Sequence, residues 1–241
     1  MASPVIHSPA PLILAVENST MCGSVALVSG GSCLYEQSLL SSKTHSKRLL
    51  PSLKRAMAET GLEWDELDAL AVSLGPGSFT GLRIGLATIK GLALATGLPL
   101  IGVSSLSGLA SQFPHCSLQL CPILDARKSE VYTALYQNQA GVMTRTSDYL
   151  VMEPSKLCRL LKEPTLFVGD GVPPYQEEIS AELGPLAHFA PGQGFFPRAA
   201  SLGQLAVSRY LAEDFSDPAT AVPIYIRASE AEINLRQKQL G

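Results

Sequence analysis

The fold of this chain follows from residues 70–103, which read LAVSLGPGSFTGLRIGLATIKGLALATGLPLIGV. An apolar run stops at Gly75-Pro76-Gly77, a second run continues without proline over residues 79–96, and a third begins after Pro99. Short apolar runs bounded by glycine and proline are typical of strands, and a long proline-free run is typical of a helix. The stretch therefore predicts a strand–helix–strand unit.

The predicted helix over residues 79–96 is apolar around most of its circumference. Arg83 and Lys90 are its only charged residues, and they lie on one face. Small residues recur at intervals of four, at Gly81 and Gly85 and again at Ala87, Gly91 and Ala95. Such spacing lets another backbone approach a helix closely. We therefore expect the helix to be covered by its own sheet and by a second partner.

Three interpretations of residues 75–85 remain open. A phosphate-binding loop is one, because glycines before a helix expose amide groups. However, Leu82 follows Gly81 where a P-loop has lysine, and the glycine spacing differs from the dinucleotide fingerprint. A purely structural turn is the second, since glycine permits a sharp strand-to-helix turn. The third is a docking surface for another subunit, which is compatible with the second.

Composition limits the class of protein. The 241 residues suffice for one large or two small domains, and the formal net charge of −3 argues against a strongly basic nucleic-acid binder. The five cysteines are odd in number and scattered, which predicts reduced thiols. Residues 1–11 are expected to be a disordered lead-in rather than a signal peptide. No stretch is expected to span a membrane, so we expect a cytoplasmic protein.

The same succession of elements occurs twice along the chain. Residues 12–105 and residues 106–217 each read as βββαβαβ, and residues 218–241 form a tail. We therefore expect an α/β protein of two tandem βββαβαβ lobes, similar to the actin-like and sugar-kinase-like (ASKHA) architecture. In that architecture a nucleotide lies in the cleft between the lobes.

Three further expectations concern single elements. A helix over residues 45–60 is expected to turn Leu49, Leu50, Leu53 and Met57 inward. A helix is expected over residues 104–113. In the second half, strands are expected over residues 118–124, 130–137 and 142–151.

Six segments resemble, in the same order, the TsaB (YeaZ) family: ILAVENST, THSKRLLPSL, the central stretch, ILDARKSEVYTALY, VGDG and VPIYIR. The resemblance runs from about residue 12 to residue 227. It implies a subunit of the bacterial machinery that makes threonylcarbamoyladenosine in tRNA, at the adenosine beside the anticodon. It also implies pairing with the paralogue TsaD, which performs the chemistry, and with the ATPase TsaE, so that contact with tRNA is indirect. Without TsaD, homodimerisation through the helices over residues 45–60 and 79–96 is implied.

Two departures from related patterns bear on catalysis. The family usually has aspartate at the end of its first strand, whereas Glu17 stands here and moves the carboxylate by about 1.5 Å. TsaD-type proteins carry two helical histidines at i and i+4, a metal-binding spacing. No two of the four histidines of this chain have it. We therefore expect no catalytic residue, no metal site and no tightly bound cofactor in this subunit, with ATP and magnesium used by the complex.

Two sets of residues are candidate binding sites. The candidate partner-binding set comprises Leu49, Leu53, Gly81, Arg83, Ile84, Gly85, Ala87, Thr88, Lys90, Gly91 and Ala95. The candidate vestigial nucleotide cleft comprises Glu17, Ser19, Thr20, Asp125, Gly169 and Asp170.

The cleft set has an alternative interpretation. The acids at positions 17 and 125 are turn residues that cap neighbouring amides in this interpretation, which the sequence favours. The expected function is a non-catalytic scaffold that binds TsaD and helps to recruit TsaE, and Gly85→Arg is expected to block pairing without unfolding the chain. The alternative is an active ATPase, kinase or peptidase of the same superfamily.

Overall fold

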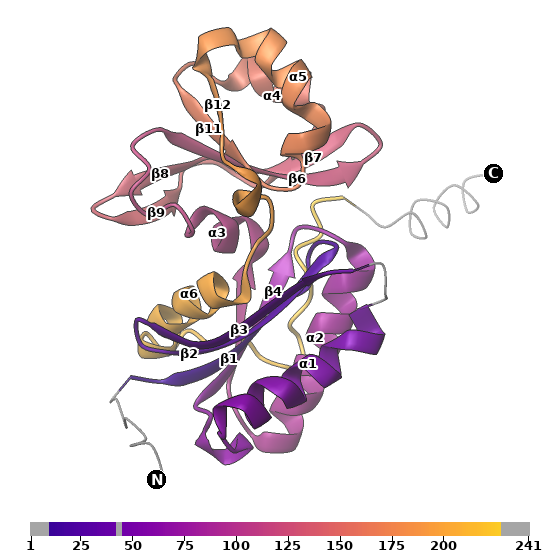
Figure 1. Ribbon diagram of the computed structural model, residues 1–241, viewed down its shortest axis with the longest axis vertical. Helices are drawn as coiled ribbons and strands as arrows, with labels where there is room; N and C mark the ends of the chain where they lie inside the picture. The colour runs from indigo at the N-terminus through magenta and orange to yellow at the C-terminus, as the bar shows by residue number, and fades with distance from the viewer. Residues whose placement is uncertain (1–9, 42–44, 228–241) are drawn as a thin grey trace, which may run out of the picture.

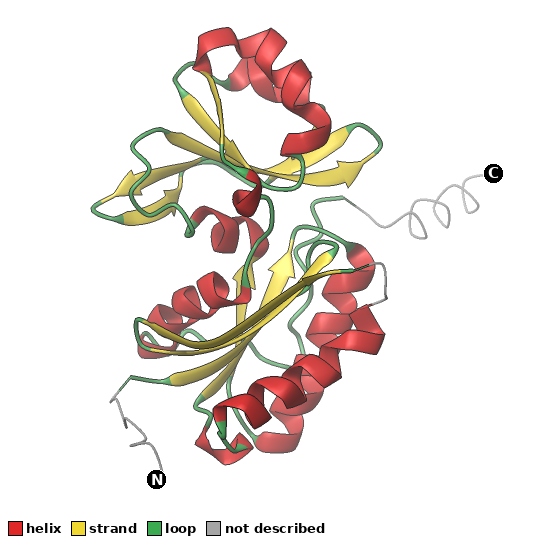
Figure 2. Ribbon diagram, viewed as in Figure 1, coloured by secondary structure: helices red, strands yellow, loops and turns green. Residues whose placement is uncertain are grey.

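The computed structural model describes residues 10–41 and 45–227, which form two lobes, each built on its own sheet (Figures 1 and 2). The expected lead-in at residues 1–9 and the charged end of the tail at residues 228–241 lie outside the described residues.

The first lobe contains a five-stranded sheet in the order β3-β2-β1-β4-β5. Its strands are β1 (Leu12–Glu17), β2 (Cys22–Ser29), β3 (Ser32–Leu40), β4 (Ala69–Gly75) and β5 (Leu100–Ser104). The first three strands are antiparallel, whereas β1, β4 and β5 run parallel. Helices α1 (His45–Thr60) and α2 (Phe79–Thr96) cover one face, and η1 (Trp64–Glu66) precedes β4.

The second lobe repeats this order as β10-β7-β6-β11-β12. Its elements are β6 (Gln119–Arg127), β7 (Glu130–Thr133), β8 (Tyr136–Gln139), β9 (Val142–Arg145), β10 (Leu150–Met152), α4 (Pro154–Leu160), β11 (Thr165–Val168), α5 (Val172–Leu183), η2 (Gly184–Leu186) and β12 (Ala187–Phe189). The β8–β9 hairpin has no counterpart in the first sheet. The predicted α/β fold of two tandem lobes is confirmed, with this hairpin as an addition.

Three predicted elements were too long. The strand predicted over residues 130–137 is broken into β7 and β8, because β7 pairs with β6 from Ile123 onward while Tyr136 of β8 pairs with Leu120. The strand predicted over residues 142–151 is likewise divided into β9 and β10. The helix predicted over residues 104–113 is only α3 (Ser105–Ala110), which leads from the first lobe into the second.

The central strand β1 is buried on both faces. Leu14 and Val16 point into the core formed with α1 and α2, and Ile13 and Ala15 point into a second core on the opposite face. This alternation is the ordinary period of a strand. The second core is closed by α6 (Ala199–Leu211), which follows the short η3 (Gly192–Gly194) after the second lobe.

Helix α6 therefore packs on the first sheet, although the sequence-based boundary at residue 217 places it in the second lobe. Its inward residues are Ala199, Leu202, Ala206 and Val207. Figure 1 shows the chain crossing from the second lobe to reach this position. The boundary predicted at residue 217 assigned α6 to the wrong lobe. The repeated order of strands and helices in the sequence does not reveal which sheet a helix covers.

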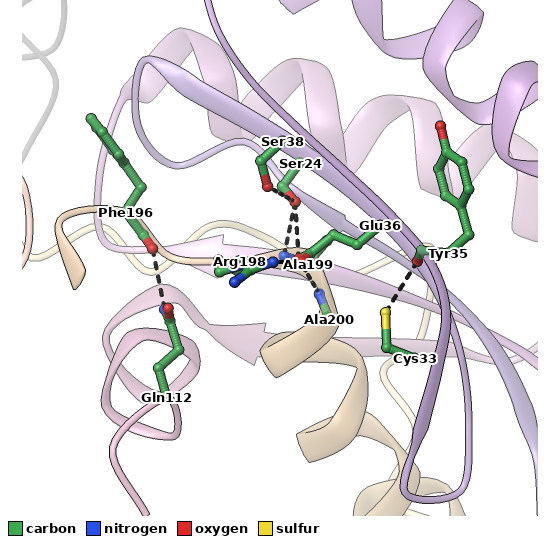
Figure 3. A network of polar contacts seen from close by, with 10 residues as sticks. All are labelled: Ser24, Cys33, Tyr35, Glu36, Ser38, Gln112, Phe196, Arg198, Ala199 and Ala200. Atoms are coloured by element: carbon green, nitrogen blue, oxygen red, sulfur yellow. Dashed lines mark hydrogen bonds and ion pairs between the residues drawn. The ribbon is translucent and has the colours of Figure 1, made fainter. Parts of the chain in front are cut away.

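First-lobe side chains hold the beginning of α6 (Figure 3). The Ala200 amide donates to Glu36 Oε1 at 3.0 Å, and the Ala199 amide donates to Ser24 Oγ at 3.1 Å. Arg198 pairs with Glu36, whose side chain is only 8% exposed. The first amides of a helix lack partners within it. Residues of β2 and β3 thus cap a helix that is far away in the sequence.

We predict that Glu36→Ala lowers the free energy of unfolding by about 2 kcal/mol, because it removes a helix cap and a half-buried ion pair together. Urea unfolding measures the change. Glu59→Ala is the matched control, since Glu59 pairs with Arg55 at 4.0 Å while both side chains are about 60% exposed. A loss of less than about 0.5 kcal/mol is expected there. Equal losses in the two variants would contradict the capping role of Glu36.

Candidate functional site

Helix α2 presents one strip of its surface to solvent. Over residues 83–95, the exposed residues are Arg83, Ala87, Gly91, Leu94 and Ala95, which we call the α2 stripe. Leu94 is 78% exposed, and a side chain added at Gly91 would meet no atom within 4 Å. Because residues four apart lie on one helix face, the stripe is a continuous surface of mostly small and apolar residues.

Several predicted partner-binding residues lie elsewhere. Gly81 and Gly85 are buried, and a Cβ atom at Gly85 would lie 3.4 Å from Asn18 Cβ, so this glycine faces the sheet. On α1, Leu49 and Leu53 are buried in the core, whereas Leu50, expected inside, is 52% exposed. Gly81, Gly85, Leu49 and Leu53 are therefore corrections to the predicted surface. The two glycines were misplaced because a helix that is apolar all round gives no periodic signal for its outer face. Leu49 and Leu53 lie on the inner side of α1, as the apolar pattern of that helix itself predicts.

The predicted residues Ile84, Thr88 and Lys90 are partly exposed and border the stripe. The remaining circumference of α2 is covered within the chain. Helix α1 and β4 contribute to the core beneath it, and Ala221 of the C-terminal segment packs against the same core. From the sequence alone, residues 218–241 are predicted only as a tail, and no local pattern indicates that part of it packs against α2.

A cleft of about 940 Å³ lies between the lobes. The predicted cleft residues Ser19, Thr20, Asp125 and Asp170 line it together, and the start of α2 contributes Ser78 and Thr80. The C-terminal segment contributes residues 224–227. The predicted residues Glu17 and Gly169 do not line the cleft.

The turn between β4 and α2 is pressed against the turn after β1. Gly77 has φ +154°, and a Cβ atom there would lie 2.3 Å from the Ser19 carbonyl oxygen. The Ser78 amide donates to that carbonyl at 2.6 Å, and the Gly81 amide donates to Ser78 Oγ at 3.3 Å. Since the protein itself occupies these amides, the geometry favours a structural turn over a phosphate-binding loop.

Glu17 is fully buried beneath the cleft. Its Oε1 accepts the Ser19 amide two residues ahead, as a turn-capping acid does. Burial is the main cause that raises the pKa of Glu17, and the charge of Asp170 adds to the effect. Among the described residues, Glu17 Oε2, Ser19 Oγ and Ser73 Oγ lack a hydrogen-bond partner of good geometry. A protonated Glu17 would supply a donor to this group.

The two aspartates of the second lobe lie side by side. Asp125 caps the Arg127 amide at 2.8 Å and pairs with the Arg127 guanidinium at 3.1 Å. The Asp125 amide donates to Asp170 Oδ1 at 3.1 Å. Burial, followed by repulsion from Asp125, raises the pKa of Asp170 from 3.8 to about 6. The carboxylates are thus used by the protein itself, which supports the capping interpretation.

These residues do not fit a magnesium-bound phosphate. Magnesium requires carboxylate oxygens free to bind it directly or through water. Here Glu17 is turned under the cleft, Asp125 is paired with Arg127, and Asp170 accepts an amide. Across residues 10–41 and 45–227, no three His, Cys, Asp or Glu side chains are grouped to hold a metal ion. Over the same ranges, no helix combines the length and apolarity needed to cross a bilayer.

We predict that Asp170→Asn stabilises the protein near pH 7.5 by about 2 kcal/mol and has little effect near pH 4. A carboxyl whose folded pKa is raised favours folding fully below pH 3.8, and this contribution is lost as the pH rises to about 6. Asparagine keeps the acceptor oxygen and removes the charge. Urea unfolding at both pH values provides the measurement, with exposed Asp65→Asn as the control. A gain that is the same at both pH values would contradict the assignment.

Comparison with known proteins gives one consistent result. The family model for TsaD, described as tRNA N6-adenosine threonylcarbamoyltransferase, matches residues 39–235. The tRNA threonylcarbamoyladenosine biosynthesis protein TsaB of Bacillus subtilis is 32% identical over 231 residues, covering 94% of this chain and 99% of that protein. TsaB of Escherichia coli is 36% identical over 145 residues, covering 59% and 62% respectively.

Solved structures agree with these relatives. YeaZ from Pseudomonas aeruginosa superimposes with a TM-score of 0.77 at 29% identity, over 90% of this chain and 100% of that one. The ethanolamine utilization protein EutJ from Carboxydothermus hydrogenoformans superimposes with a TM-score of 0.51 over 83% of this chain and 91% of its own; at 12% identity it shows the fold alone. The two-lobed fold, the near full-length match and the family model together place this chain in the TsaB (YeaZ) family of tRNA threonylcarbamoyladenosine biosynthesis proteins.

Proposed function

We propose that this chain is a non-catalytic scaffold subunit that binds a TsaD paralogue through the α2 stripe, with α1 beside it. The observation that carries the proposal is an exposed strip of Ala87, Gly91, Leu94 and Ala95 on a helix whose other sides are covered. Small side chains let a second helix approach closely, and burial of the exposed leucine favours association.

The nature of the partner is supported by the family model. Because the TsaD family model matches residues 39–235 of this chain, which include α2, we infer that a TsaD protein carries a helix corresponding to α2. Two related folds can pair through like helices, as two copies of one chain do in a symmetric dimer. We therefore propose TsaD as the partner and a homodimer through the same stripe when TsaD is absent.

The remaining roles follow from this pairing and from family membership. We propose that the pair helps to recruit the ATPase TsaE, that ATP and magnesium are used by the complex, and that tRNA is engaged through the partner. The chain would then support threonylcarbamoyl transfer to the adenosine beside the anticodon in the cytoplasm. The engaged carboxylates of the cleft support the absence of a tightly bound cofactor in this subunit.

The alternative is an active enzyme of the same superfamily, and the 940 Å³ cleft is the observation that favours it. An ATPase or kinase would need free carboxylates for magnesium, and a peptidase would need a nucleophile beside a base. Among the described residues, no histidine lines the cleft.

We predict that Gly91→Arg weakens TsaD binding at least about 100-fold, because a long side chain prevents close helix contact. The isolated variant should remain folded, since the site is open and arginine is the better helix former. Size-exclusion chromatography with light scattering measures pairing, and circular dichroism measures folding. Gly31→Arg is the matched control, because it also lies in open space but on the β2–β3 turn. A Gly91→Arg variant that still co-elutes with TsaD would refute docking on the stripe.

This variant replaces the Gly85→Arg test that the sequence suggested. Gly85 is buried against Asn18 and Val72, so arginine there is expected to unfold the chain rather than report on pairing.

We also predict that the isolated protein binds ATP with magnesium more weakly than about 1 mM, because Glu17 is buried beneath the cleft, Asp125 is paired with Arg127 and Asp170 accepts an amide. Isothermal titration calorimetry tests this, with the mixture of this protein, TsaD and TsaE as the positive control. Micromolar binding by the protein alone would support the enzyme alternative instead.

A further inference from the structure

The C-terminal segment, residues 216–227, runs along α2 and connects it to the second lobe (Figure 1). The Ser216 amide donates to the Leu100 carbonyl at the edge of the first sheet, and Asp217 is attracted by Lys90. Further on, the Ile224 amide donates to the Leu74 carbonyl at 2.7 Å. The segment is thus held by backbone hydrogen bonds on both sides of its passage along α2.

Tyr225 lies directly on Arg83, the charged member of the α2 stripe. Arg83 Nε donates to the Tyr225 hydroxyl at 3.1 Å. The guanidinium carbon lies 3.7 Å from the centre of the Phe79 ring and 5.9 Å from that of the Tyr225 ring. The two rings are themselves 5.1 Å apart. Two aromatic rings and one hydrogen bond therefore hold a guanidinium that is exposed to solvent.

Within the described part of the chain, no carboxylate pairs with the positive charge of Arg83. Arg83 forms no ion pair with any residue in 10–41 or 45–227. Its Nε is used by Tyr225, whereas no hydrogen bond is made by Nη1 or Nη2 within the same ranges. A free arginine loses side-chain entropy when it is fixed in a contact. Here the rings have already restricted it, so a carboxylate can bind it at a smaller entropic cost.

We propose that Tyr225 is a positioning residue that presets Arg83 to bind a carboxylate of the partner docked on the α2 stripe. The inference rests on the proposed function, because it concerns the same surface. It makes the C-terminal segment part of the interface, although Tyr225 lies 142 positions from Arg83 in the sequence.

The second lobe holds the C-terminal segment just after Tyr225. Arg227 pairs with Glu130 of β7 and donates to the Ala126 carbonyl at 2.7 Å. Tyr225 is thus placed between an anchor on β4 and an anchor on the second lobe. Loss of the second anchor is expected to loosen Tyr225 and to weaken binding of the partner, by less than removal of the ring itself.

The test measures the affinity of the full chain for the TsaD protein of the same organism by calorimetry at 50 and 300 mM NaCl. We expect Arg83→Ala and Tyr225→Ala each to weaken binding about tenfold at low salt, and the double variant to be no weaker than Arg83→Ala. Tyr225→Phe, which keeps the ring, should recover most of the loss. The salt dependence of binding should fall in every variant that lacks or frees Arg83.

Arg145→Ala is the matched control, because Arg145 also lies over a tyrosine ring, Tyr149, at 4.1 Å but on the second lobe. Its affinity should equal that of the unchanged protein. Unfolding temperatures of all variants show whether a loss is merely structural. Unchanged affinity in Tyr225→Ala, or losses at Arg83 and Tyr225 that simply add, would overturn the positioning role. If the unchanged protein fails to bind TsaD, the proposed function fails instead, before this inference is reached.

Discussion

An eighteen-residue helix with only two charged side chains cannot leave most of its circumference in water, and the arrangement of this molecule follows from that constraint. Helix α2 is covered by its sheet, by α1 and by a segment from the far end of the chain. The surface that remains exposed is the narrow α2 stripe, whose residues are small or apolar apart from Arg83. Such a surface is suited to a second helix and poorly suited to solvent.

In the cleft between the lobes, the main requirement is that buried polar groups find hydrogen-bond partners, rather than that apolar surface is covered. The Ser78 and Gly81 amides at the start of α2 and the carboxylates of Asp125 and Asp170 form hydrogen bonds within the chain. A site that binds phosphate or magnesium must keep these groups available. In this cleft the same groups form hydrogen bonds that hold the chain's own turns together. The engaged polar groups therefore support the proposal that the molecule acts through its outer surface rather than through the cleft.

The elements of this fold were largely predictable, because local patterns specify them. The turn at Gly75–Gly77 and the apolar runs beside it place β4, α2 and β5, and the residues that end each strand locate the cleft. The outer face of α2 was not predictable, since Gly85 and Gly91 look alike in a helix without a polar side. Nor was the contact of Tyr225 with Arg83, because a pairing between distant positions leaves no local signal.

The return of α6 to the first sheet makes the second lobe an insertion between β5 and α6. The chain is synthesised from its N-terminus, so α6 emerges from the ribosome only after the second lobe. The face of β1 that carries Ile13 and Ala15 therefore stays exposed to solvent until residue 211, the end of α6, has emerged. The strands of the second sheet, β6 to β12, are continuous in the sequence, so this sheet can form without any strand that is synthesised later. During synthesis the lobe that begins first is therefore completed last. In the nascent chain, the apolar sheet face of the first lobe stays uncovered while the whole second lobe is synthesised.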